Sequence, residues 1–156
     1  MFGKLKNLFG GGSGIEITAP VAGKVVALED VPDPTFAQGI LGPGIAIEPT
    51  EGRIVAPADG TVDVMFETGH AVSLTTAGGA ELLIHVGIDT VQLEGRHYKA
   101  CCKAGDAVKK GDTLIEFDPE AIRAEGYKIV TPILICNPDA FKDVKPVAGE
   151  TVSPGD

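Results

Sequence analysis

Frequent glycine and proline divide this chain into short apolar runs. The 156 residues include 21 glycines and 11 prolines, and both residue types interrupt regular helices and mark turns. The runs between them are rich in valine, isoleucine and threonine, which is typical of strands. Expected strands cover residues 15–18, 24–28, 44–47, 53–56, 61–66, 71–75, 81–86, 107–108, 113–117, 129–131 and 133–136, with a last one near Thr151. The pattern predicts an all-β fold, a compact antiparallel β-sandwich or flattened barrel.

Two further patterns refine this prediction. One or two short helical turns are expected, at residues 34–37 and at 119–125, where Asp118 is a suitable N-cap and Pro119 a suitable first residue. The stretch APVAGKV at 19–25 is echoed by APADGTV at 56–62. Each echo is a Pro-x-x-Gly turn that enters a valine-rich strand, which predicts duplicated hairpin motifs. Two such units are too few for a solenoid.

Composition narrows the functional classes. The net charge of −9 argues against nucleic-acid binding, which needs clustered basic residues, and suits a protein partner with a positive surface. The three cysteines have neither disulfide nor metal-knuckle spacing, so we expect reduced thiols. No apolar stretch reaches the roughly 18 residues that span a bilayer, and no secretion signal is apparent. A cytoplasmic location is expected.

The chain divides into a tail, residues 1–14, and a domain, residues 15–156. Phe2, Leu5, Leu8 and Phe9 have helical spacing, and a glycine-rich linker follows. One interpretation is a short amphipathic helix that makes weak contact with an anionic membrane. The alternative is a disordered terminus, because so short a helix is marginal in water.

His85 lies in the apolar run LLIHVGI at residues 82–88, and His70 lies 15 residues upstream. Strand alternation places His85 on the face opposite Leu82, Ile84 and Val86. Residues 76–80 form a plausible hairpin loop that would bring His70 alongside.

These two histidines admit several roles from pattern alone. They can be satisfied core residues, half of a zinc site, or a phosphoryl-transfer pair in which His85 attacks phosphorus and His70 donates to a phosphoryl oxygen. In the last case the Gly87 carbonyl can set the tautomer of His85, and the Thr68 hydroxyl can orient His70. The third histidine, His97, is expected at the surface.

The run ELLIHVGIDTV at residues 81–91 resembles the active-site strand of the glucose-type IIA component of the bacterial sugar phosphotransferase system. Other stretches resemble family motifs in family order. They are VPDPTFA at 31–37, GIAI at 44–47, VAPADG at 55–60, FETGHA at 66–71, KKGD at 109–112 and TP at 131–132. The resemblance covers nearly the whole chain, in a stand-alone form. It implies an antiparallel β-sandwich with a shallow apolar depression that holds both histidines.

The resemblance also implies roles for particular residues of a phosphotransferase component that requires no cofactor. His85 matches the histidine that accepts a phosphoryl group from phospho-HPr and passes it to a cysteine on the IIB domain of a glucose-type permease. His70 matches the supporting histidine, and Thr68 the residue bonded to it. Gly87 and Asp89 adjoin the site, Asp89 at its rim. Seven apolar positions match the partner-binding face: Phe36, Ile40, Leu41, Phe66, Val72, Leu83 and Val91.

Enteric members imply further properties: regulation of glycerol kinase or sugar permeases in the unphosphorylated state, and zinc on both histidines. Their lipid-binding tail resembles residues 2–8. A purely regulatory module that binds zinc through His70 and His85 is therefore the alternative function. A lysostaphin-type zinc peptidase would need a His-x-His pair, which the chain lacks, and a biotinyl or lipoyl carrier would need a modifiable lysine at a hairpin tip, where none stands out.

Overall fold

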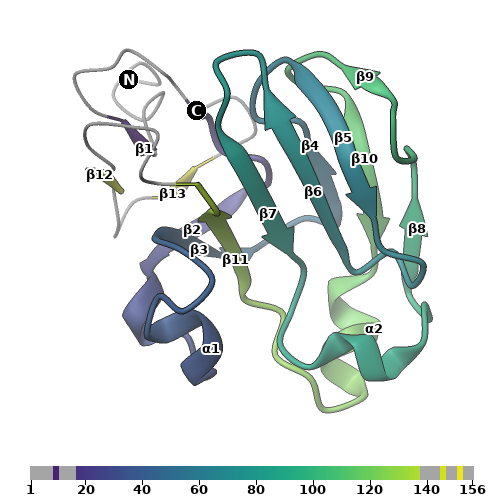
Figure 1. Ribbon diagram of the computed structural model, residues 1–156. Coiled ribbons are helices and arrows are strands. Elements are labelled where there is room, and N and C mark those ends of the chain that lie inside the picture. Colours follow the sequence, from purple (N-terminus) through teal and green to yellow (C-terminus); the bar gives the residue numbers. More distant parts are fainter. Residues whose placement is uncertain (1–8, 11–16, 138–144, 147–150, 153–156) are drawn as a thin grey trace.

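A computed structural model describes residues 9–10, 17–137, 145–146 and 151–152 (Figure 1). The larger sheet has the strand order β13-β2-β3-β11-β7-β6-β5-β9, the smaller one β4-β10-β8, and β1 pairs with β12. The strands are β1 (Phe9–Gly10), β2 (Gly23–Ala27), β3 (Gly44–Pro49), β4 (Arg53–Val55), β5 (Gly60–Met65), β6 (Ala71–Thr76), β7 (Glu81–His85), β8 (Tyr98–Ala100), β9 (Ala107–Val108), β10 (Thr113–Phe117), β11 (Thr131–Ile135), β12 (Lys145–Pro146) and β13 (Thr151–Val152). All pairings are antiparallel among these residues, which confirms the predicted fold class.

The main core lies between the two sheets. Alternate residues of the large sheet, such as Val25, Ile45 and Ile84, face Ile54 and Ile115 of the small sheet, and all of them are buried. Aliphatic side chains fill this core with little aromatic help, as the composition requires.

A second apolar cluster covers the outer face of the large sheet. Ala46 and Leu134 present their side chains there, and Phe36 of α1 (Pro34–Ala37) packs on them. Helix α1 lies at the lower left of Figure 1, beside β3 and β11. Its N-cap, Asp33, accepts a hydrogen bond from the Thr35 amide, and proline occupies the first turn. This small helix therefore closes the outer face next to the end of β7.

The predicted hairpin units exchange backbone hydrogen bonds. The Val55 amide donates to the Pro20 carbonyl, and the Thr18 amide donates to the Pro57 carbonyl. Both units enter the large sheet at a glycine. A Cβ at Gly60 would lie 2.3 Å from the Thr75 carbonyl oxygen, so the close approach of the neighbouring strand requires glycine.

Several details differ from the sequence-based expectations. The two strands expected at 129–131 and 133–136 are replaced by one, β11 (Thr131–Ile135), because Pro132 pairs opposite Ala46 and pairing with β7 begins at the next residue. Strand β8 was not predicted. Residues 9–10 form a strand pair instead of the end of a helix, whereas residues 1–8 lie outside the described part of the chain. Helix α2 (Pro119–Ala124) agrees with the expectation, because it begins directly after the predicted N-cap, Asp118.

The remaining features are two 3₁₀ helices, the length and hydropathy of the helices, and the state of the cysteines. Short 3₁₀ helices η2 (Leu28–Asp30) and η3 (Thr90–Leu93) follow β2 and β7. In the described ranges, no helix is both long and apolar enough to cross a bilayer. Cys101, Cys102 and Cys136 are free thiols.

Candidate functional site

Strand pairing brings the two histidines of the sequence motif together. In the register of β6 and β7, Ala71 lies opposite His85, and the Val86 amide donates a 2.7 Å hydrogen bond to the His70 carbonyl. The imidazole centroids of His70 and His85 are 4.9 Å apart with an angle of 82° between the rings. The loop between the strands turns at residues 77–79, within the predicted hairpin loop.

Strand alternation decides what each residue of β7 faces. Leu82 and Ile84, together with Val86 just beyond the strand, are buried in the main core. Leu83 and His85 are partly exposed on the outer face. The expected orientation of His85 is therefore present in the structure, and its ring lies 5.0 Å from that of Phe36, centroid to centroid.

The backbone after β7 determines the tautomer of His85. Its Nδ1 lies 2.7 Å from the Gly87 carbonyl oxygen. A carbonyl can only accept, so Nδ1 carries the proton and Nε2 keeps its lone pair. Gly87 has φ +92°, and an added Cβ would lie 2.5 Å from Cγ2 of Thr90. Glycine is required at this position both for the left-handed conformation and for the close contact.

His70 occupies a drier position than His85. It is 3% exposed, its Nδ1 is hydrogen-bonded to Oγ1 of Thr68, and its ring meets Phe66 edge-on. Burial, assisted by the neighbouring His85, lowers the pKa of His70 from 6.5 to about 4. Burial also lowers the pKa of His85, against the raising effects of the Gly87 hydrogen bond and of Asp33 and Asp89. Both rings are therefore neutral near pH 7.

Two carboxylates lie at the rim of the site. Asp89 was expected there from the sequence, and Asp33, the N-cap of α1, was not. Asp89 has the left-handed backbone conformation, with φ 59°, which is uncommon for a residue other than glycine. Both carboxylates favour positive charge on the His85 ring, although burial of the ring has the larger effect.

Four of the seven proposed partner-binding residues are exposed apolar side chains: Ile40, Leu41, Phe66 and Val91. Leu83 is partly exposed. Phe36 is nearly buried, and its ring packs against that of His85. The prediction for Val72 was wrong. It lies opposite Ile84 in the β6–β7 register, so its side chain points into the main core and is fully buried.

A metal site is not assembled by this pair. Within the described ranges, no group of three or more histidine, cysteine or acidic side chains is placed to hold a metal ion. His70 and His85 supply two ligands, whereas zinc in proteins usually has four. The alternative of a zinc-binding module therefore has no support from the geometry.

Sequence reasoning missed two hydroxyl groups next to the site. Thr90 Oγ1 and the Tyr98 hydroxyl each donate a 2.7 Å hydrogen bond to the Val86 carbonyl oxygen. The Tyr98 ring also faces that of His70 edge-on, with centroids 6.5 Å apart. Tyr98 belongs to the unpredicted strand β8, so no periodic signal pointed to it.

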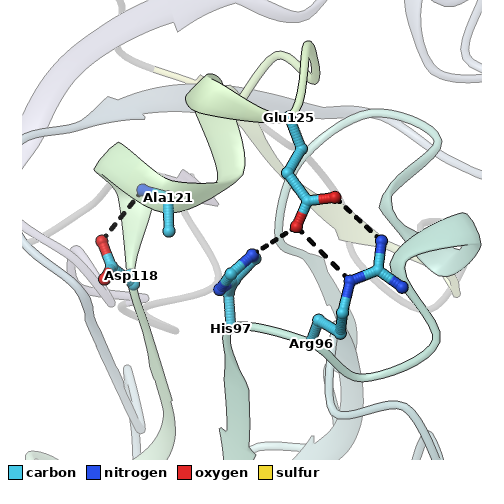
Figure 2. Close-up of polar contacts among 5 residues, drawn as sticks. All are labelled: Arg96, His97, Asp118, Ala121 and Glu125. Carbon is cyan, nitrogen blue, oxygen red and sulfur yellow. Dashed lines mark hydrogen bonds and ion pairs between the residues drawn. The ribbon is translucent and has the colours of Figure 1, made fainter.

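His97 lies apart from this pair. Its Nε2 is 2.5 Å from Oε2 of Glu125, and Arg96 Nη2 is 2.9 Å from Oε1 of the same carboxylate, as Figure 2 shows. The expected surface position is only partly accurate, because the His97 side chain is 28% exposed. It is a member of an ion-pair cluster near α2.

Comparison with known proteins gives this geometry a family. Residues 15–141 match the family model of the phosphoenolpyruvate-dependent sugar phosphotransferase system, EIIA 1. The chain is 46% identical over 153 residues to the glucose-specific EIIA component of Bacillus anthracis, covering 96% of this chain and 93% of the relative. A solved structure, the glucose permease IIA from Mycoplasma capricolum, superposes with a TM-score of 0.85 at 32% identity, covering 91% of this chain and 92% of that one.

Other relatives carry the same unit inside a longer chain. The β-glucoside-specific EIIBCA component of Dickeya chrysanthemi is 54% identical over 134 residues, which are 86% of this chain. This chain spans about a fifth of such relatives, 21% of the Dickeya protein and 19% of the glucose-specific EIIBCA component of Corynebacterium glutamicum. The family match, the near full-length relative and the paired neutral histidines together show that the chain belongs to the EIIA 1 family of the phosphoenolpyruvate-dependent sugar phosphotransferase system.

Proposed function

We propose that this protein is a phosphocarrier whose His85 accepts a phosphoryl group from phospho-HPr and passes it to a cysteine on the IIB domain of a glucose-type sugar permease. One observation carries the proposal. The Gly87 carbonyl holds the proton on Nδ1 of His85, so the lone pair on Nε2 is available in a partly exposed apolar site. Family membership supports the same role.

Acceptance of the phosphoryl group by His85 needs no external acid or base. Nε2 of His85 forms a bond to phosphorus as the P–N bond of the donor phosphohistidine breaks, and the donor ring leaves neutral. The His85 ring gains positive charge, which the Gly87 carbonyl and the carboxylates of Asp33 and Asp89 stabilise. In onward transfer the acceptor cysteine attacks as its thiolate, a P–S bond forms as the P–N bond breaks, and His85 leaves as the original neutral ring.

His70 has a supporting role in this scheme. When the Thr68 hydroxyl donates to Nδ1, the His70 proton resides on Nε2, from which it can be donated to a phosphoryl oxygen. A neutral ring at this site also avoids a second positive charge beside the phosphorylated ring. We assign His70 mainly to onward transfer, where charge on the departing phosphoryl group must be held in place.

Both partners would dock on the apolar face around the histidines. Ile40 and Val91 are 67% and 51% exposed, an unusual exposure for such side chains that suits protein contact. Since the net charge is −9, partners with a basic rim are favoured. The exchange belongs in the cytoplasm, where a donor charged from phosphoenolpyruvate is found.

A phosphorylation assay tests the proposal. The full chain is incubated with phosphoenolpyruvate, enzyme I and HPr, and an acid-labile, base-stable adduct is quantified. One phosphoryl group per chain is expected, and it is absent from His85→Ala. His97→Ala is the matched control, because it removes a histidine from the ion-pair cluster and should still carry one group. Normal labelling of His85→Ala would refute the assignment.

The regulatory partners implied by the resemblance are a separate proposal. Glycerol kinase or sugar permeases would bind the same face when His85 is unphosphorylated, so phosphorylation should abolish their capture. Zinc would need at least one further donor from such a partner, because the pair supplies two ligands. Membrane contact would depend on residues 1–10, and liposome flotation with and without those residues tests it.

A further inference from the structure

Tyr98 connects the two halves of the candidate site. Its ring meets His70 edge-on, and its hydroxyl donates to the carbonyl of Val86, the residue between His85 and Gly87. The amide of Val86 in turn donates to the His70 carbonyl. The backbone of Val86, the chain neighbour of His85, therefore links Tyr98 and His70 through two hydrogen bonds.

The same tyrosine packs against the turn that carries His70. A Cβ on Gly69 would lie 3.4 Å from Cβ of Tyr98, so that turn rests directly on β8. Gly95, just before Tyr98, lies similarly near Thr68, with 3.6 Å from its would-be Cβ to the Thr68 carbonyl oxygen. Tyr98 thus contacts the backbone that adjoins each of the two rings.

Tyr98 itself is firmly seated. It pairs opposite Phe117 of β10, and the two rings are stacked with centroids 6.3 Å apart. The turn before it contains His97 with φ +74°, a strained conformation that persists where neighbours hold it. Figure 2 shows the holding contacts, in which Arg96 and His97 both bind Glu125 at the end of α2.

We infer that Tyr98 is a positioning residue for phosphoryl transfer: its hydroxyl fixes the peptide that places the Gly87 carbonyl against His85, and its ring keeps water from His70. The inference rests on the proposed function. Burial raises the pKa of Tyr98 to about 12, so the phenol remains a hydrogen-bond donor throughout the neutral range. Thr90 donates to the same carbonyl, which predicts a partial effect when either hydroxyl is removed.

Three variants of the full chain separate hydroxyl, ring and general effects. Tyr98→Phe removes one oxygen, Tyr98→Leu removes the ring, and Tyr127→Phe removes the hydroxyl of the other tyrosine as a matched control. Tyr98→Phe should slow acceptance from phospho-HPr about three- to tenfold, the effect of one neutral hydrogen bond. Tyr98→Leu should raise the pKa of His70 from about 4 towards 6.5 as water enters. Tyr127→Phe should do neither.

Two readouts distinguish positioning from stability. Imidazole ¹⁵N shifts, recorded over pH on the unphosphorylated protein, should change for His85 in Tyr98→Phe, and they do not depend on transfer activity. Acceptance rates should stay lowered when each variant is assayed at the same interval below its own Tm. Wild-type rates and unchanged ring shifts in Tyr98→Phe would overturn the inference. Failure of the wild type to accept phosphate would instead overturn the proposed function. The imidazole ¹⁵N shifts of His85 would then still test whether Tyr98 positions the ring.

Discussion

The paired histidines, His70 and His85, and the third histidine, His97, show the same residue type in two opposite environments. His70 and His85 lie 4.9 Å apart among apolar groups, and burial lowers the pKa of both. His97 lies against the Glu125 carboxylate, together with Arg96. In the first environment the imidazole is kept neutral and its lone pair is available. In the second, a carboxylate occupies the ring nitrogen that a substrate would need.

The difference shows that surroundings, rather than residue type, decide the chemistry of a histidine. A reactive imidazole needs a dry face and a hydrogen bond that fixes one nitrogen while leaving the other free. His85 meets both conditions through β7 alternation and the Gly87 carbonyl. His97 instead has a structural role, because its hydrogen bond to Glu125 joins the turn before β8 to the end of α2.

Replacing His70 should produce the largest difference between the two environments. His70→Ala should still accept phosphate on His85 but transfer it to a IIB domain about a hundredfold more slowly, which is the usual contribution of a positioned proton donor. His97→Ala should change this rate far less. Single-turnover discharge of the phosphorylated protein measures both. Equal discharge rates for the two variants would contradict the proposed role of His70 in onward transfer.

Acid should destabilise the fold through His70. Its pKa is about 4 in the folded state and 6.5 in the reference state, so the unfolded chain binds the proton more tightly. The stability from the neutral ring is complete above pH 6.5 and is lost as pH falls towards 4, by at most about 3 kcal/mol. Urea unfolding of wild type and His70→Gln at pH 7, 5.5 and 4.5 should show their difference shifting in favour of the variant. A difference that is constant with pH would contradict the assigned pKa.

The smallest effect is expected at the exposed ion-pair cluster. Hydrogen bonds from Arg96 and His97 lower the pKa of Glu125 from 4.5 to about 2. Any stability from this carboxylate is present above pH 4.5 and lost as pH falls towards 2. Because exposed ion pairs contribute little, Glu125→Gln should lower Tm slightly at pH 7, and less in 1 M salt. Thermal scans measure this, and a Tm loss that persists in salt would indicate a packing role instead.

Local patterns were sufficient for much of the fold and for the motif residues. Period-two alternation in β7 gave the outward position of His85, and Asp118-Pro119 predicted the start of α2. The family resemblance predicted Val72 on the outer face, but strand alternation in β6 places its side chain on the opposite one. Ser73 lies opposite Leu83 and shares the outer face, so Val72 faces the core. No sequence pattern predicted the position of Tyr98, because β8 is short and largely exposed.

The amino-acid sequence determined an all-β chain, a hairpin with two histidines, and a glycine at the position whose carbonyl orients His85. Those features depend on neighbours along the chain, through alternation, turn chemistry and backbone conformation. Only the tertiary structure showed that Asp33 and Tyr98 adjoin the pair and that the Phe36 ring packs against His85, since these residues come from α1, its N-cap and β8, outside the hairpin that carries the histidines. Phe36 packs near His85 and Tyr98 near His70, and both contribute to the burial that keeps the imidazoles neutral, whereas Asp33 acts on His85 in the opposite direction. No local pattern records these contacts.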